Sequence, residues 1–366
     1  MKVMMYWFIG LVVVAALGVM AFLQHPKFGK LPSGPELSLI QASPNYSAGE
    51  FRNQLETPLF TQGQSFVSVL MENIREPGER LVPQQPIPAL DVDFYKLDVN
   101  EDMVIWLGHS SYYIHIGGLR LLLDPVFSEV ASPLPFVNRA FAGTNRYSVE
   151  NMPRIDYLLI SHDHWDHLDY PTILGLKSKV GKVVVGLGVG SYFRGWGYDN
   201  ERVLEGDWYE QFTLDDGVTL HIIPARHYSG RAMTRNQTLW VGFVLESNEH
   251  RFLFSGDSGY GPHFVEIGKR FNGFDVVSLD QGQYDSRWAL IHMTPEEASK
   301  AAMELGAKAL LPAHVGRFSL ARHAWDEPFQ RIRTISEGKS YRLLTPSIGE
   351  PIRFTDAEPQ SFRNWW

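Results

Sequence analysis

Histidine and aspartate residues gather in a few short segments of this chain. The densest segment is residues 162–167, which read His-Asp-His-Trp-Asp-His, and further candidates are His227, Asp257 and His314. Imidazole and carboxylate groups are ligands that suit zinc, and two neighbouring zinc ions can generate hydroxide from water near neutral pH. The chain has no cysteine, which excludes thiolate ligands and a cysteine nucleophile. The residue types therefore predict a dinuclear metal site with hydrolytic chemistry.

Each candidate ligand follows a short apolar run of the kind that forms a buried strand. The runs and the ligands after them are residues 158–160 and His162, 221–223 and His227, 252–254 and Asp257, and 310–311 and His314. Loops at strand ends are held by a rigid sheet, so they can assemble a site from distant parts of a chain. Any one of the later ligands alone is more often an ordinary polar residue. The dense run followed by all three favours a metal site.

The apolar runs and the turn residues between them predict an α/β protein. A hairpin is expected around Gly117-Gly118, and a helix is expected after the N-cap Thr294, with Pro295 at its first position and Glu297 completing a capping box. A second helix is expected at residues 264–271. Two successive groups of strands, each followed by helices, predict two packed sheets with helices outside, an αβ/βα sandwich. The expected strands are 104–107, 112–116, 119–123, 157–160, 183–185, 219–223, 239–245, 251–254, 276–279 and 309–311.

Length and charge set limits on the function. A chain of 366 residues holds one large α/β domain or two modest ones. Charged residues make up 20% and hydrophobic residues 44%, a balance typical of globular proteins. The formal net charge of -8 argues against a nucleic-acid partner, which would require a basic face. The composition leaves the oligomeric state open.

The N-terminus predicts a membrane segment. No charged residue occurs from Met4 to Leu23, and about twenty helical residues span roughly 30 Å, the hydrocarbon thickness of a bilayer. A single-pass anchor is favoured over a cleaved signal, because the apolar stretch is long and lacks a good cleavage site. We expect residues 1–30 to be this anchor or signal, residues 31–99 a proline-rich extension, and residues 100–366 the hydrolase domain. The extension wraps the domain, lines its entrance or is a plain spacer from the membrane; the sequence does not separate these roles.

Several segments together resemble the metallo-β-lactamase superfamily. Residues 162–167 resemble its metal-binding signature. Softer similarities point to the branch of N-acylphosphatidylethanolamine-hydrolysing phospholipases D. They lie at residues 106–110 (WLGHS), 123–125 (LDP), 224–227 (PARH), 255–260 (SGDSGY) and 292–298 (HMTPEEA). The resemblance covers residues 100 to 345 and implies the metallo-β-lactamase αβ/βα sandwich.

The resemblance also implies a set of ligands for two zinc ions per chain. Asp257 would bridge the ions, and a hydroxide between them would be the nucleophile. Two zinc ions, two aspartates and a hydroxide sum to about +1, which suits a developing oxyanion. Flavodiiron-type oxidoreductases of the same fold have a carboxylate in place of His164, so that alternative is disfavoured. The ligands implied are His162, His164 and His227 for one ion and Asp166, His167 and His314 for the other.

Four kinds of neighbouring residue have roles that the resemblance only suggests. Asp124 matches an acidic residue that orients the ligand loop, and His109 is either such a residue or a buried structural histidine. His292 matches a histidine that contacts substrate, and it also directly precedes the helix at residue 295, so a structural role stays open. Four arginines near the motifs are candidates for binding a phosphate, with ordinary solvated arginines slightly favoured: Arg226, Arg231, Arg235 and Arg287.

The preferred function is a zinc-dependent phosphodiesterase that acts on N-acyl phospholipids or related membrane lipids. His292 and Asp257 are its expected catalytic residues. The anchor would place the domain beside its substrate, in a bacterial inner membrane with the domain in the periplasm. The first alternative is a lactonase or another hydrolase of small esters or phosphoesters, because one fold and one metal pair serve many substrates. A second alternative is a non-catalytic membrane-associated regulatory module, which the complete ligand set disfavours.

Overall fold

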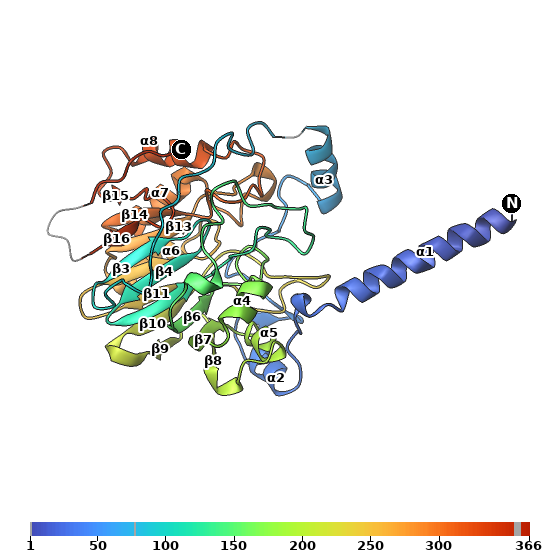
Figure 1. The fold of residues 1–366 in the computed structure, drawn as a ribbon, viewed down its shortest axis with the longest axis horizontal. Helices are drawn as coiled ribbons and strands as arrows, with labels where there is room; N and C mark the ends of the chain where they lie inside the picture. The colour runs from blue at the N-terminus through green and yellow to red at the C-terminus, as the bar shows by residue number, and fades with distance from the viewer. Residues whose placement is uncertain (1, 77, 355–359) are drawn as a thin grey trace.

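Two seven-stranded sheets pack face to face in the computed structural model, which describes residues 2–76, 78–354 and 360–366 (Figure 1). The strand order of the first sheet is β16-β3-β4-β5-β6-β7-β8, and that of the second is β15-β14-β13-β12-β11-β10-β9. The strands of the first sheet are β3 (Met103–Trp106), β4 (Tyr112–Ile116), β5 (Leu119–Leu123), β6 (Ile155–Ile160), β7 (Val180–Gly186), β8 (Val203–Gly206) and β16 (Pro351–Arg353). Those of the second are β9 (Gln211–Thr213), β10 (Thr219–Pro224), β11 (Val241–Glu246), β12 (Arg251–Phe254), β13 (Val276–Asp280), β14 (Ala309–Ala313) and β15 (Arg342–Leu343).

Parallel pairing places several strand ends at one edge of the sandwich. Strands β5 to β8 run parallel in the first sheet, and β12 to β15 run parallel in the second. The predicted hairpin joins β4 to β5 through Gly117 and Gly118, both of which have positive φ angles, as a tight hairpin turn requires. The carboxyl ends of the parallel strands therefore lie together, and the loops that follow them share one face of the molecule.

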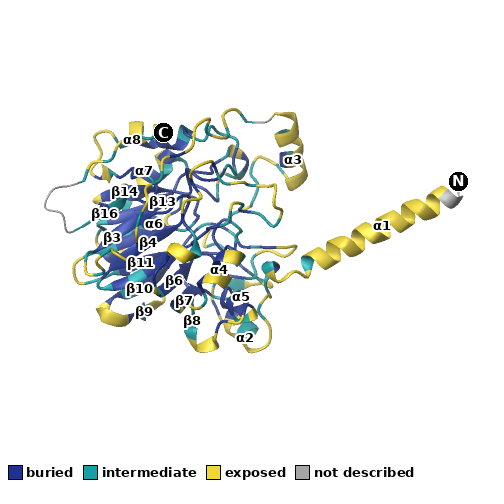
Figure 2. Cartoon of the chain, in the orientation of Figure 1, coloured by how far each residue is buried: buried dark blue, intermediate teal, exposed yellow. Residues whose placement is uncertain are grey.

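The main core lies between the two sheets, where apolar side chains from both are almost fully buried (Figure 2). A second apolar cluster lies between the second sheet and its covering helices. These helices are α6 (His263–Phe271), α7 (Pro295–Glu304) and α8 (Glu327–Ser336), and the first sheet is flanked by α4 (Tyr170–Leu176) and α5 (Gly190–Gly195). This arrangement confirms the predicted αβ/βα sandwich.

Helix α7 begins where its sequence predicts. The Thr294 hydroxyl accepts a hydrogen bond from the Glu297 amide at 3.3 Å, and the Glu297 carboxylate accepts one from the Thr294 amide at 2.9 Å. This reciprocal pair satisfies two amides that a helix start otherwise leaves without partners. Because Pro295 needs no amide partner, the helix can start directly at this residue.

The N-terminal part of the chain differs more from expectation. Helix α1 (Lys2–Leu23) projects away from the body and is exposed (Figures 1 and 2). By length and composition, its part Met4–Leu23 is able to cross a membrane, with a mean hydropathy of 2.4. The extension forms α2 (Pro35–Gln41), the hairpin of β1 (Tyr46–Ser47) and β2 (Glu50–Phe51), and α3 (Phe66–Arg75). The sequence pattern did not predict these four elements, which are short and lie in a proline-rich segment.

Candidate metal centre

The structure brings together all seven residues that the sequence predicts as metal ligands. Four of them follow β6 in the loop of residues 162–167. The other three follow strands of the second sheet: His227 after β10, Asp257 after β12 and His314 after β14. The site is therefore assembled from loops of both sheets at the edge where the parallel strands end.

Three histidine rings form the first ligand group. The Nε2 atom of His162 lies 2.9 Å from Nδ1 of His164, and Nε2 of His227 lies 3.2 Å from the same atom. The Nδ1 atom of His227 lies 3.0 Å from the backbone oxygen of Ile291. A hydrogen bond to this carbonyl requires the proton on Nδ1, which leaves the lone pair of Nε2 directed at the other two rings. Three converging ring nitrogens are suited to binding one cation.

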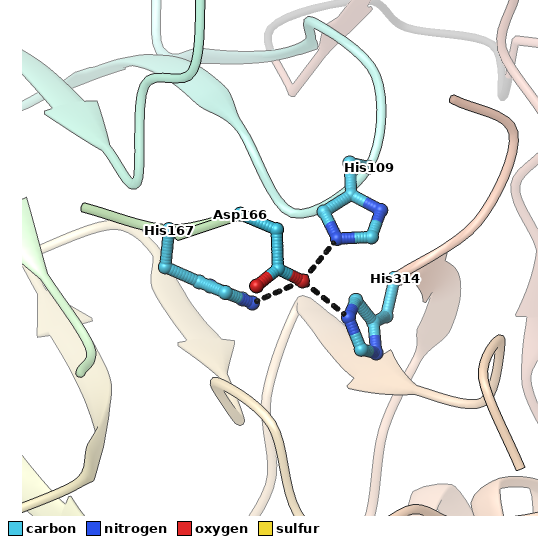
Figure 3. A group of neighbouring side chains, drawn as sticks. All are labelled: His109, Asp166, His167 and His314. Carbon is cyan, nitrogen blue, oxygen red and sulfur yellow. Dashed lines mark hydrogen bonds and ion pairs between the residues drawn. The ribbon is translucent and has the colours of Figure 1, made fainter. Parts of the chain in front are cut away.

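Asp166 is at the centre of the second group, which Figure 3 shows. Its Oδ2 atom lies 2.8 Å from Nε2 of His109, 3.1 Å from Nε2 of His314 and 3.5 Å from Nε2 of His167. His109 comes from the loop after β3, and the sequence left its role open between orientation and structure. The structure places its ring on the carboxylate of a predicted ligand, where it can orient that carboxylate.

Asp257 lies between the two groups. Its Oδ1 atom is 3.2 Å from Nε2 of His167, and its Oδ2 atom is 3.3 Å from Nε2 of His314. Oδ2 also lies 3.8 Å from Nε2 of both His162 and His227. One carboxylate thus faces both groups, as a bridging ligand must.

Two further aspartates hold the ligand rings in place. The Asp124 carboxylate lies 2.8 Å from Nδ1 of His167 and accepts a hydrogen bond from the Ser161 amide at 2.7 Å. The Asp280 carboxylate lies 3.2 Å from Nδ1 of His314 and 2.7 Å from Nδ1 of His292. Such contacts fix the tautomer and direction of a ligating ring.

Asp280 is the site residue that sequence reasoning missed. It is the last residue of β13, directly after the apolar run of residues 276–279. It therefore has the same strand-end context as the predicted ligands. That context was a usable signal, although it lay outside the segments that carry the family resemblance.

Three residues of the site have a left-handed backbone. The φ angles are 57° at His109, 43° at Asp124 and 62° at His314. This region is costly for residues other than glycine, by about 1 kcal/mol or more each, and such strain gathers at functional sites. Gly256, with a φ of 60°, precedes Asp257, and a Cβ atom at Gly256 would lie 2.6 Å from the Val241 oxygen.

The two ligand groups differ in their electrostatics. Burial holds the pKa of His162 and of His227 well below the usual value, so both rings are neutral. Burial also acts to lower the pKa of His314, but the nearby Asp257 and Asp280 carboxylates outweigh it and raise this pKa to about 10. The first group is therefore a set of neutral nitrogens, whereas the rings of the second lie beside ionised carboxylates.

The donors fit a pair of metal ions. Oδ1 of Asp257 and Nε2 of His167 are buried and lie 3.2 Å apart, but neither makes a hydrogen bond of normal geometry within the described ranges. Buried polar atoms are normally satisfied, so these two are suited to a cation. Nitrogen and carboxylate donors without sulfur are typical of zinc, and they also accept other divalent metals.

A cavity of about 470 Å³ opens above the site. Five of the predicted ligands border it, and so does His292. Its upper walls include Leu59, Phe60 and Phe66 from the N-terminal extension and Trp288 from the body. The extension therefore lines the entrance of this cavity, which is one of the roles considered for it. The ligands that border the cavity are His164, Asp166, His227, Asp257 and His314.

The four candidate arginines have different surroundings. Arg226 donates hydrogen bonds to Thr57, Glu56 and Tyr260. Arg287 pairs with Asp285 and Asn73. Arg231 is buried and bonds to backbone oxygens of the ligand loop and of Lys27. Arg231 and Arg235 both border the cavity, but Arg231 is already held by backbone oxygens, whereas the Arg235 guanidinium lies over the Tyr228 ring. Arg235 is therefore the best placed of the four to meet an anionic group.

Comparison with known proteins identifies the class. The family described as "Beta-lactamase superfamily domain" matches residues 119–315. An uncharacterised protein of Mycobacterium tuberculosis is 34% identical over 90% of this chain and 89% of its own length. The isothiocyanate hydrolase from Delia radicum gut bacteria shares the fold, with a TM-score of 0.55 at 18% identity over 69% of this chain and 98% of that one.

The chain belongs to the metallo-β-lactamase superfamily, the class that its sandwich fold and strand-end His/Asp clusters define. Within that class it is a relative of the N-acylphosphatidylethanolamine-hydrolysing phospholipases D, as the sequence motifs predict. One such relative is the N-acyl-phosphatidylethanolamine-hydrolyzing phospholipase D 1 of Caenorhabditis elegans. It is 28% identical over 78% of this chain and 86% of its own length. The protein is therefore a metal-dependent hydrolase of this superfamily.

Proposed function

We propose that the protein is a dinuclear zinc-dependent phosphodiesterase that cleaves N-acyl phospholipids or closely related membrane lipids. The observation that carries this proposal is the joint geometry of site and cavity. Seven metal donors from both sheets meet at one site; five of them border the cavity as its polar floor, and apolar side chains of the extension form walls above it. A polar reacting centre below apolar walls suits a lipid whose head group reacts while its chains stay out of water.

The ligand set supports two zinc ions per chain. His162, His164 and His227 offer three neutral nitrogens, and Asp166, His167 and His314 offer the second set. Bound zinc would lower the pKa of water and offset negative charge on a phosphoryl group. Asp257, which faces both sets, would hold the two ions in register.

His292 is proposed to position the substrate. Its Nδ1 atom lies 2.7 Å from Asp280, and the residue borders the cavity beside the ligands. A hydrogen bond from Nδ1 to this carboxylate leaves Nε2 available toward the cavity. That nitrogen can accept or donate a hydrogen bond to the head group or the acyl amide of the lipid.

Membrane attachment belongs to the same proposal. Helix α1 would serve as a single-pass anchor, in a bacterial inner membrane with the hydrolase domain in the periplasm. Its exposed apolar surface supports this, because such a surface is unfavourable in water. The proposed division is residues 1–30 as anchor, 31–99 as extension and 100–366 as hydrolase domain.

A substrate panel tests the proposed activity. Full-length, zinc-loaded protein is incubated with an N-acyl phospholipid, a plain phospholipid, a soluble phosphodiester, an acyl lactone and a β-lactam. We expect the highest kcat/KM for the N-acyl phospholipid. Preference for the lactone or the β-lactam over every phosphodiester would reject the phosphodiesterase assignment and favour a hydrolase of small esters or amides.

A further inference from the structure

Helix α3 has its apolar side turned away from the protein. The side chains of Phe66, Val67, Leu70, Met71 and Ile74 are between 43% and 67% exposed. At 100° per residue these five positions share one face of the helix. A surface helix of a water-soluble domain normally buries this face, so α3 has the opposite orientation from the usual one.

The polar side of α3 is held against the body instead. Asn73 accepts a hydrogen bond from Arg287 of the body at 2.8 Å, and Glu72 accepts one from Gln64, just before the helix, at 2.9 Å. The same Glu72 carboxylate lies 3.5 Å from Arg287. Val69 is the buried apolar residue of the helix. These contacts fix the outward direction of the apolar face, which is therefore a built feature of the fold.

Helix α3 forms part of the entrance to the cavity over the metal centre. Phe66, Val69 and Asn73 line this cavity. The loop of residues 131–138 and the loop of residues 232–235 also contribute lining residues. Each of these loops carries an exposed apolar side chain, Phe136 at 73% and Met233 at 84%. Exposed apolar groups thus occur on three separate segments around one opening.

The segment after α1 is fixed to the same part of the body. Arg231 donates hydrogen bonds to the Lys27 oxygen and, through Nη1, to backbone oxygens of Asp163 and Leu168. Lys27 donates one to the Pro133 oxygen at 2.7 Å. The point where α1 leaves the body is therefore tied to the ligand loop and to the 131–138 loop. Figure 1 shows α3 at the side of the body from which α1 projects.

We infer that the apolar face of α3, together with Phe136 and Met233, inserts into the surface of a lipid bilayer. The bilayer is the one that α1 enters, so this inference rests on the proposed membrane attachment. An interfacial helix lies with its apolar face buried among the lipid head groups and upper acyl chains. When the protein is docked in this way, its cavity opens at the membrane surface. A lipid can then move past α3 to the metal site without crossing water.

Site-directed fluorescence tests this docking surface, and the absence of native cysteine makes the labelling specific. Single-cysteine variants of the full chain are labelled with an environment-sensitive fluorophore in nanodiscs that hold one chain and contain spin-labelled phosphatidylcholine. Val67→Cys reports on α3 and lies outside the cavity lining. Val12→Cys on α1 is the positive control, and the exposed Met303→Cys on α7 is the negative control.

We expect the lipid spin labels to quench the Val67 label at least twofold more than the Met303 label. Equal quenching of these two labels, with strong quenching of the Val12 label, would overturn the inference and leave the anchor standing. If the Val12 label is not quenched either, both are overturned. If the fluorescence of the Val67 label indicates an apolar environment only in discs that hold two chains, the apolar face of α3 contacts a second copy of the protein. This result would also overturn the inference.

A second measurement uses substrate preference. The double variant Val67→Glu/Ile74→Glu should lower turnover of a bilayer-embedded lipid at least fivefold and leave turnover of a soluble phosphodiester unchanged, because neither residue borders the cavity. Equal turnover of the embedded lipid by variant and wild type would contradict the inference. The labelling experiment decides the docking surface even if the substrate panel rejects the phosphodiesterase.

Discussion

At the floor of the cavity the side chains are polar and almost all buried, whereas the α3 face at its rim is apolar and exposed. Residues of the metal site below this floor are also held twice. His167 and His314, for example, each face the metal site with Nε2 while an aspartate holds Nδ1. On α3 the side chains of the apolar face are exposed. The helix is held through Asn73, which bonds to Arg287, and through the buried Val69.

We therefore expect the floor to determine the chemical step and the rim to determine how a membrane substrate reaches the site. A change at the floor should affect every substrate alike, because all substrates would meet the same carboxylates and the same proposed metals. A change at the rim should affect only substrates that arrive from a bilayer. Substitutions at the two levels should therefore have different effects on soluble and on membrane-embedded substrates.

The largest effect is expected for Asp257→Asn. The substitution removes a negative charge from the position that faces both ligand groups, so the ions should separate or one should leave. Turnover of every substrate should fall by about 10³-fold or more, measured as kcat with circular dichroism as a check on folding. Asp199→Asn, on an exposed side chain, is the matched control. Near wild-type turnover in Asp257→Asn would exclude a bridging role.

A smaller loss is expected for His292→Ala. Without its ring the substrate loses an orienting contact, so kcat/KM should fall by about 10²-fold, while the zinc content stays unchanged. His250→Ala is the control, because His250 pairs with Asp102 away from the metal centre. Loss of zinc in His292→Ala would show that the residue supports the metal site instead of the substrate.

Asp280→Asn should have a milder effect, because Asp280 acts through the rings of His314 and His292. Loss of such a supporting carboxylate typically weakens metal affinity or activity by about 10-fold or more. Competition with a chelator measures the affinity. Asp275→Asn is a matched control, since Asp275 lies just before the opposite end of β13 and pairs with Lys308. An equal response of both variants would contradict the supporting role.

The smallest effect on catalysis is expected for Phe28→Ala. Phe28 is buried after α1 and packs edge-on against Trp165 of the ligand loop, with 5.3 Å between the ring centroids. Its loss should lower the free energy of unfolding by about 3 kcal/mol and change kcat little. Phe136→Ala, at an exposed site, should stay within about 0.5 kcal/mol. A truncation that removes the anchor alone should accordingly end before Pro26, so that residues 26–30 keep their contacts.

The predictability of these two levels from sequence also differs. The floor follows from local patterns, because apolar strand runs and the polar residues after them are adjacent in the chain. His162, His227 and His314 could be placed at strand ends for this reason. Asp280 has the same context but was missed, since a lone aspartate after a strand is common.

The rim could not be derived in this way. The apolar residues of 66–74 have helical spacing, but such spacing alone predicts that the apolar face is buried. The hydrogen bond between Asn73 and Arg287, which turns this face outward, joins residues 214 positions apart in sequence. The prolines around α3 further mask a helix of ten residues. The orientation of α3 therefore depends on long-range polar contacts, which the local sequence pattern does not reveal.

The zinc content of the purified full-length protein tests whether the site holds two metal ions. Elemental analysis should give two zinc ions per chain in the wild type. His164→Ala and His314→Ala, each of which removes a ligand from one group, should each retain about one. One zinc ion or none in folded wild-type protein would contradict the account.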